Sequence, residues 1–126
     1  MTALLDTSVL VGVEQGRVRQ RDVPAEATLS AVTLEELWLG VLRSDGAPRE
    51  RRRHTYAALA ALYDVLPVDA AVAVACAEIR ADGRARGVRY APFDSLIGAT
   101  ARVHALALYT QDEGMLGMLG VDVRVV

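Results

Sequence analysis

The sequence predicts an α/β fold, in which short strands alternate with helices around a central parallel sheet. Two observations support this fold class. Short apolar runs recur along the chain, and most are followed by a segment with helical spacing of apolar residues. The run Leu106–Thr110 shows no alternation of apolar and polar residues, which is typical of a strand covered on both faces. Parallel sheets bind ligands beyond the carboxyl ends of their strands, so a functional site is expected at that edge.

The first third of the chain contains two predicted strands and one predicted helix. Residues 3–5 form an apolar strand that ends in a turn over residues 6–8. The polar stretch 16–22 is predicted to be a loop or a frayed helix, and Thr28–Ser30 a second short strand. A helix is then expected over Thr33–Leu42. The apolar residues of that helix follow the spacing i, i+3, i+4, i+7 and are Leu34, Leu37, Trp38 and Val41.

The middle of the chain is predicted to contain a helix, a strand and a longer helix. Pro48 suits the first turn of a helix, and Val65–Leu66 reads as a short strand. The predicted core face of the first helix is Tyr56, Leu59 and Tyr63. Asp69 is placed to cap the longer helix, which should stop near Gly83 or Gly87. The apolar stripe of the longer helix is Val72, Cys76 and Ile79.

The last third is predicted to contain a buried helix and two strands. Pro92 and Asp94 introduce the helix. Its apolar or small residues lie nearly all round it and are Leu96, Ile97, Gly98, Ala99, Ala101 and Val103. The strand Leu106–Thr110 follows, and Val123–Val125 alternates as an edge strand should.

The composition limits the class of protein. A length of 126 residues fits one domain, residues 1–126, and 52% hydrophobic residues are enough for one core. No apolar run approaches the roughly 20 residues of a membrane span, and the N-terminus lacks the features of a signal peptide. The single Cys76 cannot form an internal disulfide, which fits the cytoplasm. All basic residues are arginine, so a P-loop or a phospho-receiver site, both of which need lysine, is excluded.

Acidic residues follow the predicted strands from four separate segments. Asp6 and Asp112 come directly after two strands that should be central and parallel, and Asp94 begins the buried helix. Glu36 is expected in the first turn of its helix, beside the end of the Thr28–Ser30 strand. Two bare carboxylates about 4 Å apart repel by roughly 4 kcal/mol at an effective dielectric of about 20, so such a cluster needs a proton or a cation. Oxygen ligands of this kind suit Mg²⁺ or Mn²⁺.

Helix capping is the alternative explanation for three of these acids. Thr33 and Glu36 match a capping box, and Asp94 and Asp112 are plausible N-caps. Capping explains Asp6 less well, because Asp6 follows a buried strand and precedes two hydroxyl residues. Capping accounts for the acids one by one but not for their common place at one edge of the sheet.

Four sequence segments resemble the PIN-domain nucleases, and within them the VapC-type toxins of bacterial toxin–antitoxin pairs. The resemblance covers essentially the whole chain. It rests on residues 4–10 (LLDTSVL), 30–40 (SAVTLEELWLG), 94–101 (DSLIGATA) and 110–112 (TQD). It implies a PIN-like three-layer fold, with about five short parallel strands flanked by helices, and RNA cleavage supported by Mg²⁺ or Mn²⁺.

The resemblance also implies the roles of particular residues. The metal-binding and catalytic acids would be Asp6, Glu36, Asp94 and Asp112. Hydroxyls in the pocket would come from Thr7, Ser8 and Thr110. Glu36 rather than Glu35 is chosen because it precedes the Leu-x-x-Gly segment of the family. The family often carries an aromatic after its last acid, whereas this chain has Glu113, which could assist or replace Asp112.

Partners and rival functions follow from the same resemblance. It implies a homodimer and a cognate VapB-type antitoxin whose tail occupies the pocket. No membrane association is expected, because no apolar run is long enough to cross a bilayer. Two alternatives stay open: a PIN nuclease with a housekeeping role in RNA processing, and a catalytically silent PIN domain that serves as a binding module. Three arginine groups are candidates for contact with the RNA backbone, and the sequence does not say which of them flank the acids. They are Arg17/Arg19/Arg21, Arg49/Arg51/Arg52/Arg53 and Arg80/Arg84/Arg86/Arg89.

Overall fold

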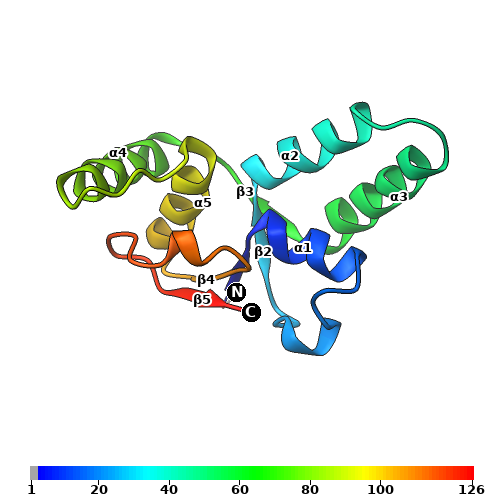
Figure 1. The fold of residues 1–126 in the computed structure, drawn as a ribbon, viewed down its shortest axis with the longest axis horizontal. Coiled ribbons are helices and arrows are strands. Elements are labelled where there is room, and N and C mark those ends of the chain that lie inside the picture. The colour runs from blue at the N-terminus through cyan, green and yellow to red at the C-terminus, as the bar shows by residue number, and fades with distance from the viewer. Residues whose placement is uncertain (1–2) are drawn as a thin grey trace.

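The computed structural model describes residues 3–126, and a five-stranded parallel sheet runs through its centre (Figure 1). The strand order is β3-β2-β1-β4-β5, so the first strand of the chain lies in the middle. The strands are β1 (Ala3–Leu5), β2 (Thr28–Ser30), β3 (Asp64–Leu66), β4 (Ala107–Thr110) and β5 (Val123–Val125). Leu4 is paired with Thr28 of β2 on one side and with Leu108 of β4 on the other.

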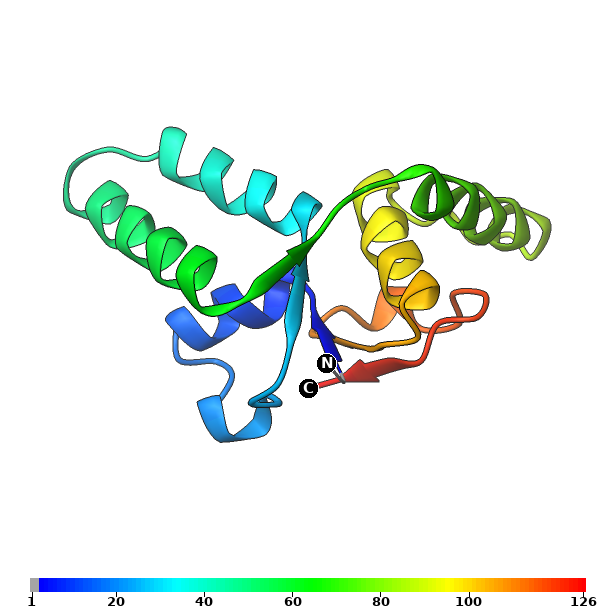
Figure 2. The same cartoon turned by 180° about the vertical axis from the view of Figure 1, so that it is seen from behind.

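Five α-helices flank the sheet. They are α1 (Thr7–Glu14), α2 (Ala31–Leu42), α3 (Gly46–Leu62), α4 (Ala70–Ala85) and α5 (Pro92–Val103). Two 3₁₀ turns, Gln20–Asp22 and Glu113–Met115, complete the described elements. The α2–α3 hairpin and the α4–α5 pair extend to opposite sides of the molecule in both Figure 1 and the reverse view of Figure 2. Parallel strands joined by helices explain this arrangement, because each crossover must place its helix on one face of the sheet.

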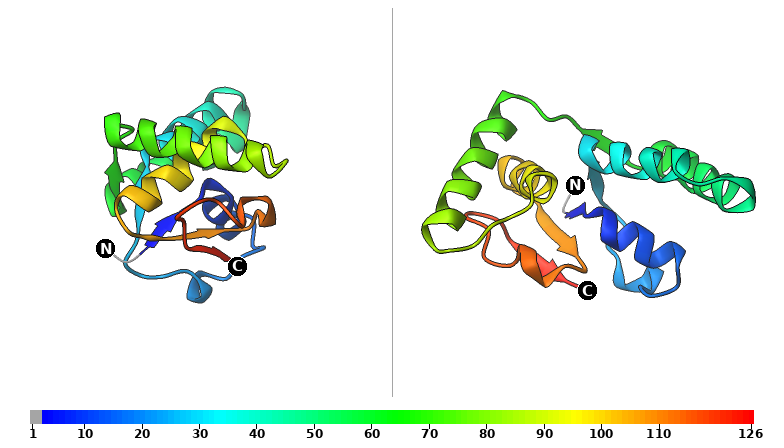
Figure 3. Two further views of the ribbon diagram at one scale, coloured as in Figure 1. Left: turned by 90° about the vertical axis from the view of Figure 1, so that its left-hand side faces the viewer. Right: turned by 45° about the horizontal axis from the view of Figure 1, so that its top comes forward.

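The central strand separates two apolar cores. Leu4 packs into the core under α4 and α5, and the next residue, Leu5, packs into the core under α1, α2 and α3. Successive side chains of a strand point to opposite faces of the sheet, and here helices cover both faces. Both side chains are therefore completely buried. The two layers of helices on either side of the sheet are visible in Figure 3. The predicted three-layer α/β arrangement, with five short parallel strands flanked by helices, is therefore confirmed.

Most predicted elements are present, and the helix after β1 is the main error. The sequence predicts a turn over residues 6–8, but α1 begins at Thr7. This helix contains three valines and a glycine, which lower intrinsic helix propensity. Val9, Leu10 and Gly12 are buried, so packing against the sheet offsets the weak propensity.

Smaller corrections concern helix ends and exposure. The second helix begins at Ala31 rather than at Thr33, with the Ser30 hydroxyl accepting a hydrogen bond from the Val32 amide. Asp69 caps α4 as predicted, and α4 ends at Ala85, two residues before Gly87. Val103, expected in the buried helix face, is 38% exposed because it ends α5. No helix within residues 3–126 has both the length and the apolar character that crossing a bilayer requires.

Candidate active site at the carboxyl edge of the sheet

Asp6 is the most buried acid at this edge. It follows β1 directly, is 5% exposed, and lies at the N-terminal end of α1 without capping it through its side chain. The hydroxyls of Ser8 and Thr110 donate hydrogen bonds to the same oxygen, Oδ2, over 2.6 and 2.8 Å. Among residues 3–126, the other oxygen of Asp6 has no hydrogen-bond donor in the structure. Two hydroxyls thus hold the carboxylate in one orientation and leave one oxygen available to a ligand.

The same hydroxyls fix the turn that carries Asp112. Ser8 Oγ accepts a hydrogen bond from the Gln111 amide, and Thr110 Oγ1 accepts one from the Asp112 amide, both over 3.0 Å. The end of β4 is therefore tied to the start of α1 by side chains that also touch Asp6. The three hydroxyl residues expected in the pocket include these two, and the third is Thr7.

Thr7 connects α1 to Glu36 on α2. Its hydroxyl lies 2.7 Å from Glu36 Oε1 and 3.1 Å from the hydroxyl of Thr33. Glu36 is the sixth residue of α2, so it lies in the second turn and not in the first turn as the sequence predicts. Thr33 is a site residue that sequence reasoning missed as such. It lies three residues before Glu36, which places both on one helix face, and this spacing could have indicated it.

Electrostatic effects connect the four acids with one another. Burial raises the pKa of Glu36, and the negative charges of Asp6 and Asp94 raise this pKa further. Burial also raises the pKa of Asp94, with further contributions from Asp6 and Asp112. Of the two neighbours Asp112 and Glu113, only Asp112 is among the groups that raise the pKa of Asp94. The arrangement favours a proton or a cation between the carboxylates.

Capping accounts for only one of the acids. The cap of α2 is Ser30, which rules out the capping box for Glu36. The residue at the N-cap of α5 is Ala91, and Asp94 lies in the first turn with no capping role. Asp112 does cap the Glu113–Met115 turn, because its Oδ1 accepts a hydrogen bond from the Gly114 amide over 2.8 Å.

The cluster is open rather than a closed cage. Within residues 3–126, no three Asp, Glu, His or Cys side chains lie close enough together to surround an ion by themselves. Mg²⁺ does not require a closed cage, because it usually binds one or two carboxylates and keeps several waters. A groove of about 420 Å³ between α1, α2 and α3 reaches the cluster, with Thr7 and Glu36 in its lining.

Comparison with known proteins identifies the family. The family model described as the PIN domain matches residues 3–118. The chain belongs to the PIN domain family. Within this PIN family, ribonuclease VapC4 of Mycobacterium tuberculosis is 40% identical over 122 residues, which cover 96% of this chain and 94% of that protein. Ribonuclease VapC8 of the same organism is 45% identical over 103 residues, covering 79% of this chain and 90% of that protein.

Solved PIN-domain structures share the fold over nearly the whole chain. The VapBC-5 toxin–antitoxin structure from Mycobacterium tuberculosis has a TM-score of 0.83 and 30% identity, covering 99% of this chain and 97% of the other. The FitAcB structure from Neisseria gonorrhoeae has a TM-score of 0.82 and 29% identity, covering 97% of this chain and 96% of the other. Nucleases of the PIN family named VapC generally depend on a divalent metal.

Proposed function

We propose that this PIN domain is a metal-dependent endoribonuclease that acts as the toxin of a VapBC-type pair. The observation that carries the proposal is the meeting of acids from four distant segments at one edge of the sheet, with the pKa of two of them raised. The names of the relatives, which are ribonucleases and toxins, support the same activity. Residues 1–126 are proposed to form one domain.

The proposed metal ligands are Asp6, Glu36, Asp94 and Asp112, and the proposed metal is Mg²⁺ or Mn²⁺. The donor set fits this choice, because it offers carboxylate oxygens and no thiolate or imidazole. The free oxygen of Asp6 and the mutual repulsion of the acids favour a divalent cation. The hydroxyls of Thr7, Ser8 and Thr110 orient the carboxylates before the metal arrives.

In the proposed reaction, the hydroxyl residues orient the carboxylates, and the acids supply the negative charge that attracts the metal. When bound, the metal supplies an activated water and stabilises the charge of the phosphate. Ser8 and Thr110 keep the Asp6 carboxylate from rotating, and Thr7 holds one oxygen of Glu36. Asp94 and Asp112 complete the negative field that attracts the cation. The proposal needs no general-base histidine, and His104 follows the end of α5 that lies opposite Asp94.

The proposed partners are an RNA substrate, a cognate VapB-type antitoxin and a second copy of the chain. Relatives solved as VapBC and FitAcB toxin–antitoxin structures support the antitoxin. A free cysteine fits action in the cytoplasm. Two alternatives differ in testable ways. A housekeeping nuclease would lack an adjacent antitoxin reading frame, and a silent binding module would bind RNA without cleaving it.

The proposal is tested by replacing single acids. Asp6→Asn and Glu36→Gln are each expected to abolish Mg²⁺-dependent cleavage of total cellular RNA, because each removes a ligand charge while keeping the side-chain shape. Glu35→Gln is the matched control, since Glu35 is the exposed neighbour of Glu36 on the same helix. Circular dichroism checks that all variants fold. Full cleavage by Asp6→Asn would disprove the site, and wild-type protein without cleavage at any Mg²⁺ concentration would favour the binding module.

A further inference from the structure

A second groove lies on the other side of the molecule from the α2–α3 hairpin. It has a volume of about 910 Å³ and is bounded by the second half of α4 and by residues 88–92. Figure 1 shows the 86–91 segment running back alongside α4 to the start of α5. Alanines, among them Ala77 and Ala81, form much of its lining, so the groove admits a chain close to the helix backbone.

All charged residues that line this groove are arginines. They are Arg80, Arg84 and Arg89, and no acid lines the groove. Each is exposed, and within residues 3–126 none of the three has a carboxylate in salt-bridge distance or a hydrogen-bonded side-chain partner. Arg80 and Arg84 lie one helical turn apart, about 6 Å along the axis, and so present their guanidinium groups on the same face. The groove therefore attracts an extended polyanion.

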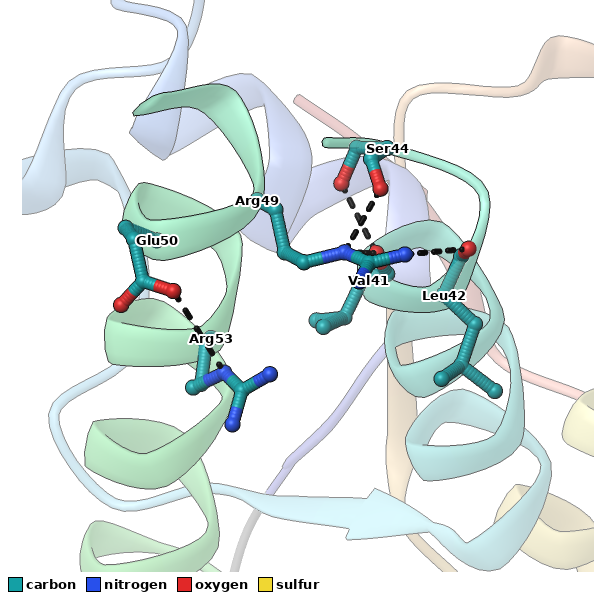
Figure 4. A network of polar contacts seen from close by, with 6 residues as sticks. All are labelled: Val41, Leu42, Ser44, Arg49, Glu50 and Arg53. Atoms are coloured by element: carbon teal, nitrogen blue, oxygen red, sulfur yellow. Dashed lines mark hydrogen bonds and ion pairs between the residues drawn. The ribbon is translucent and has the colours of Figure 1, made fainter. Parts of the chain in front are cut away.

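The other arginine groups are largely engaged within the protein. Arg49 donates hydrogen bonds to the carbonyls of Val41 and Leu42 at the end of α2 and of Ser44 just after it (Figure 4). In the same region Arg53 pairs with Glu50. Arg52 donates to the Gly40 carbonyl, and Arg19 pairs with Asp22. Structural roles thus account for these residues. Within residues 3–126, Arg21 and Arg51 of the other two groups also lack a side-chain partner, but only the α4 groove brings three such arginines together.

Arg86, the remaining arginine of this group, is also engaged within the protein. It pairs with Asp82 over 3.0 Å and donates to Tyr90 Oη and the Gly117 carbonyl. These bonds hold the 86–90 segment against the 116–117 segment, so Arg86 shapes the groove rather than lining it. The four-arginine group in the sequence therefore divides into one structural arginine and three that face the groove.

The two grooves differ in charge. The lining of the α1–α2–α3 groove includes Glu14 and Glu36 together with Arg51 and Arg52, a mixed set whose charges balance. The α4 groove holds only positive charge. Its end is also close to the acids, because Pro92 belongs to its lining and Asp94 lies two residues further along α5.

We infer that the α4 groove binds the phosphates of single-stranded RNA next to the bond that is cleaved. This inference rests on the proposed function and names the surface that holds its substrate. Arginine forms bidentate hydrogen bonds with phosphate, and three of them offset the negative field of the acids. The RNA runs along α4, passes the start of α5 and reaches the acid cluster.

The test compares two triple variants with the same change in net charge. The groove variant is Arg80→Gln/Arg84→Gln/Arg89→Gln. The control is Arg19→Gln/Arg53→Gln/Arg124→Gln, which removes three surface arginines that have ion-pair partners. Both are built on Asp6→Asn protein, so that RNA stays intact. Binding of a fluorescein-labelled single-stranded RNA of mixed sequence is measured by anisotropy between about 50 and 200 mM NaCl.

The groove variant is expected to bind RNA more weakly and with less dependence on salt. Each phosphate contact on a single strand contributes about −0.7 to the slope of log K against log salt concentration, so losing three contacts reduces the slope by about 2. The control should keep the wild-type slope. In proteins with Asp6 intact, the groove variant should raise KM for RNA far more than it lowers the single-turnover rate at saturating RNA.

Three outcomes would overturn the inference. An unchanged salt slope in the groove variant, with wild-type protein still cleaving RNA, would reject the groove and leave the proposed function standing. Conversion of a dimer to a monomer by the groove substitutions would assign the surface to contact between copies. Loss of binding to the antitoxin alone, with RNA binding intact, would assign it to an acidic protein partner. A wild-type protein that neither cleaves nor binds RNA would instead refute the proposed function.

Discussion

At the scale of single residues, Thr110 joins two of the acids through one hydroxyl. Its Oγ1 donates to Asp6 Oδ2 over 2.8 Å and accepts from the Asp112 amide over 3.0 Å, and the side chain is fully buried. A buried polar group that loses its partner keeps its desolvation cost, so this hydroxyl affects both stability and the orientation of Asp6. The site therefore depends on neutral side chains as much as on charged ones.

Thr110→Val should destabilise the protein and reduce cleavage. Valine keeps the shape of threonine but leaves the Asp112 amide without its acceptor, at a cost of about 1–3 kcal/mol. Urea unfolding and RNA cleavage are the measurements. Thr100→Val is the matched control, because Thr100 is equally buried but donates only to the Leu96 carbonyl within α5. Equal loss of cleavage in both variants would contradict a positioning role for Thr110.

At the scale of elements, contacts between helices and connecting segments set the position of α5. Gly83 of α4 is buried beneath the segment that leads to α5, and its carbonyl accepts a hydrogen bond from the Val88 amide over 2.7 Å. A Cβ atom at Gly83 would lie 2.8 Å from the ring of Tyr90 and 2.9 Å from the Val88 carbonyl oxygen. The absence of a side chain allows residues 88–90 to approach α4, and this approach places the start of α5.

Gly83→Ala should therefore destabilise the protein, by about 1–3 kcal/mol as for other overpacked sites. Gly40→Ala on α2 is the control, because nothing lies within 4 Å of a Cβ atom at Gly40. Alanine there should stabilise the helix by up to about 1 kcal/mol. Chemical denaturation of both variants measures the two free energies of unfolding. A change of the same sign and size in both would show that Gly83 reflects helix propensity alone.

The sequence predicts elements better than it predicts contacts. Strand positions and the caps of α4 follow from apolar runs and from Asp69, which are local signals. The α1 helix was not predicted, because burial of Val9 and Leu10 overrides the weak propensity of its sequence. For the site, motif resemblance indicates the acids. The hydrogen bonds from Thr7 to Glu36 and from Thr110 to Asp6 span 29 and 104 residues, and no local pattern encodes such distances.

At the scale of the whole molecule, the acid cluster opposes folding at neutral pH. The pKa of Asp94 and of Glu36 is raised above 3.8 and 4.5, respectively, by burial and by neighbouring charges. The folded protein therefore binds more protons than the unfolded chain between each ordinary pKa and the raised one. The contribution of these two carboxyl groups to stability is therefore greatest below the ordinary pKa and is lost as pH rises through the raised pKa. Repulsion between the acids thus lowers the free energy of unfolding at neutral pH, and the same repulsion favours the binding of a cation.

Asp94→Asn should relieve this repulsion and stabilise the metal-free protein at neutral pH, while abolishing cleavage. The gain should disappear as pH falls below 3.8, where the wild-type carboxyl is itself protonated. Urea unfolding in EDTA at a series of pH values measures the difference. Asp122→Asn, at an exposed position before β5 and so at the opposite edge of the sheet, should show no such gain. A difference that is constant with pH would contradict this explanation.

The central place of β1 has a consequence for how the protein is made. β1 lies between β2 and β4, and Leu4 pairs with Leu108, more than a hundred residues later in the chain. A ribosome adds about 5–20 residues per second, so Asp6 waits several seconds or longer before the segment carrying Asp112 is synthesised. During this time β1 cannot pair with β4, and Asp112 is not yet present beside Asp6. Translation products that end before β4 therefore lack an assembled site, and the proposed nuclease can cleave RNA only after the segment that carries Asp112 has been made.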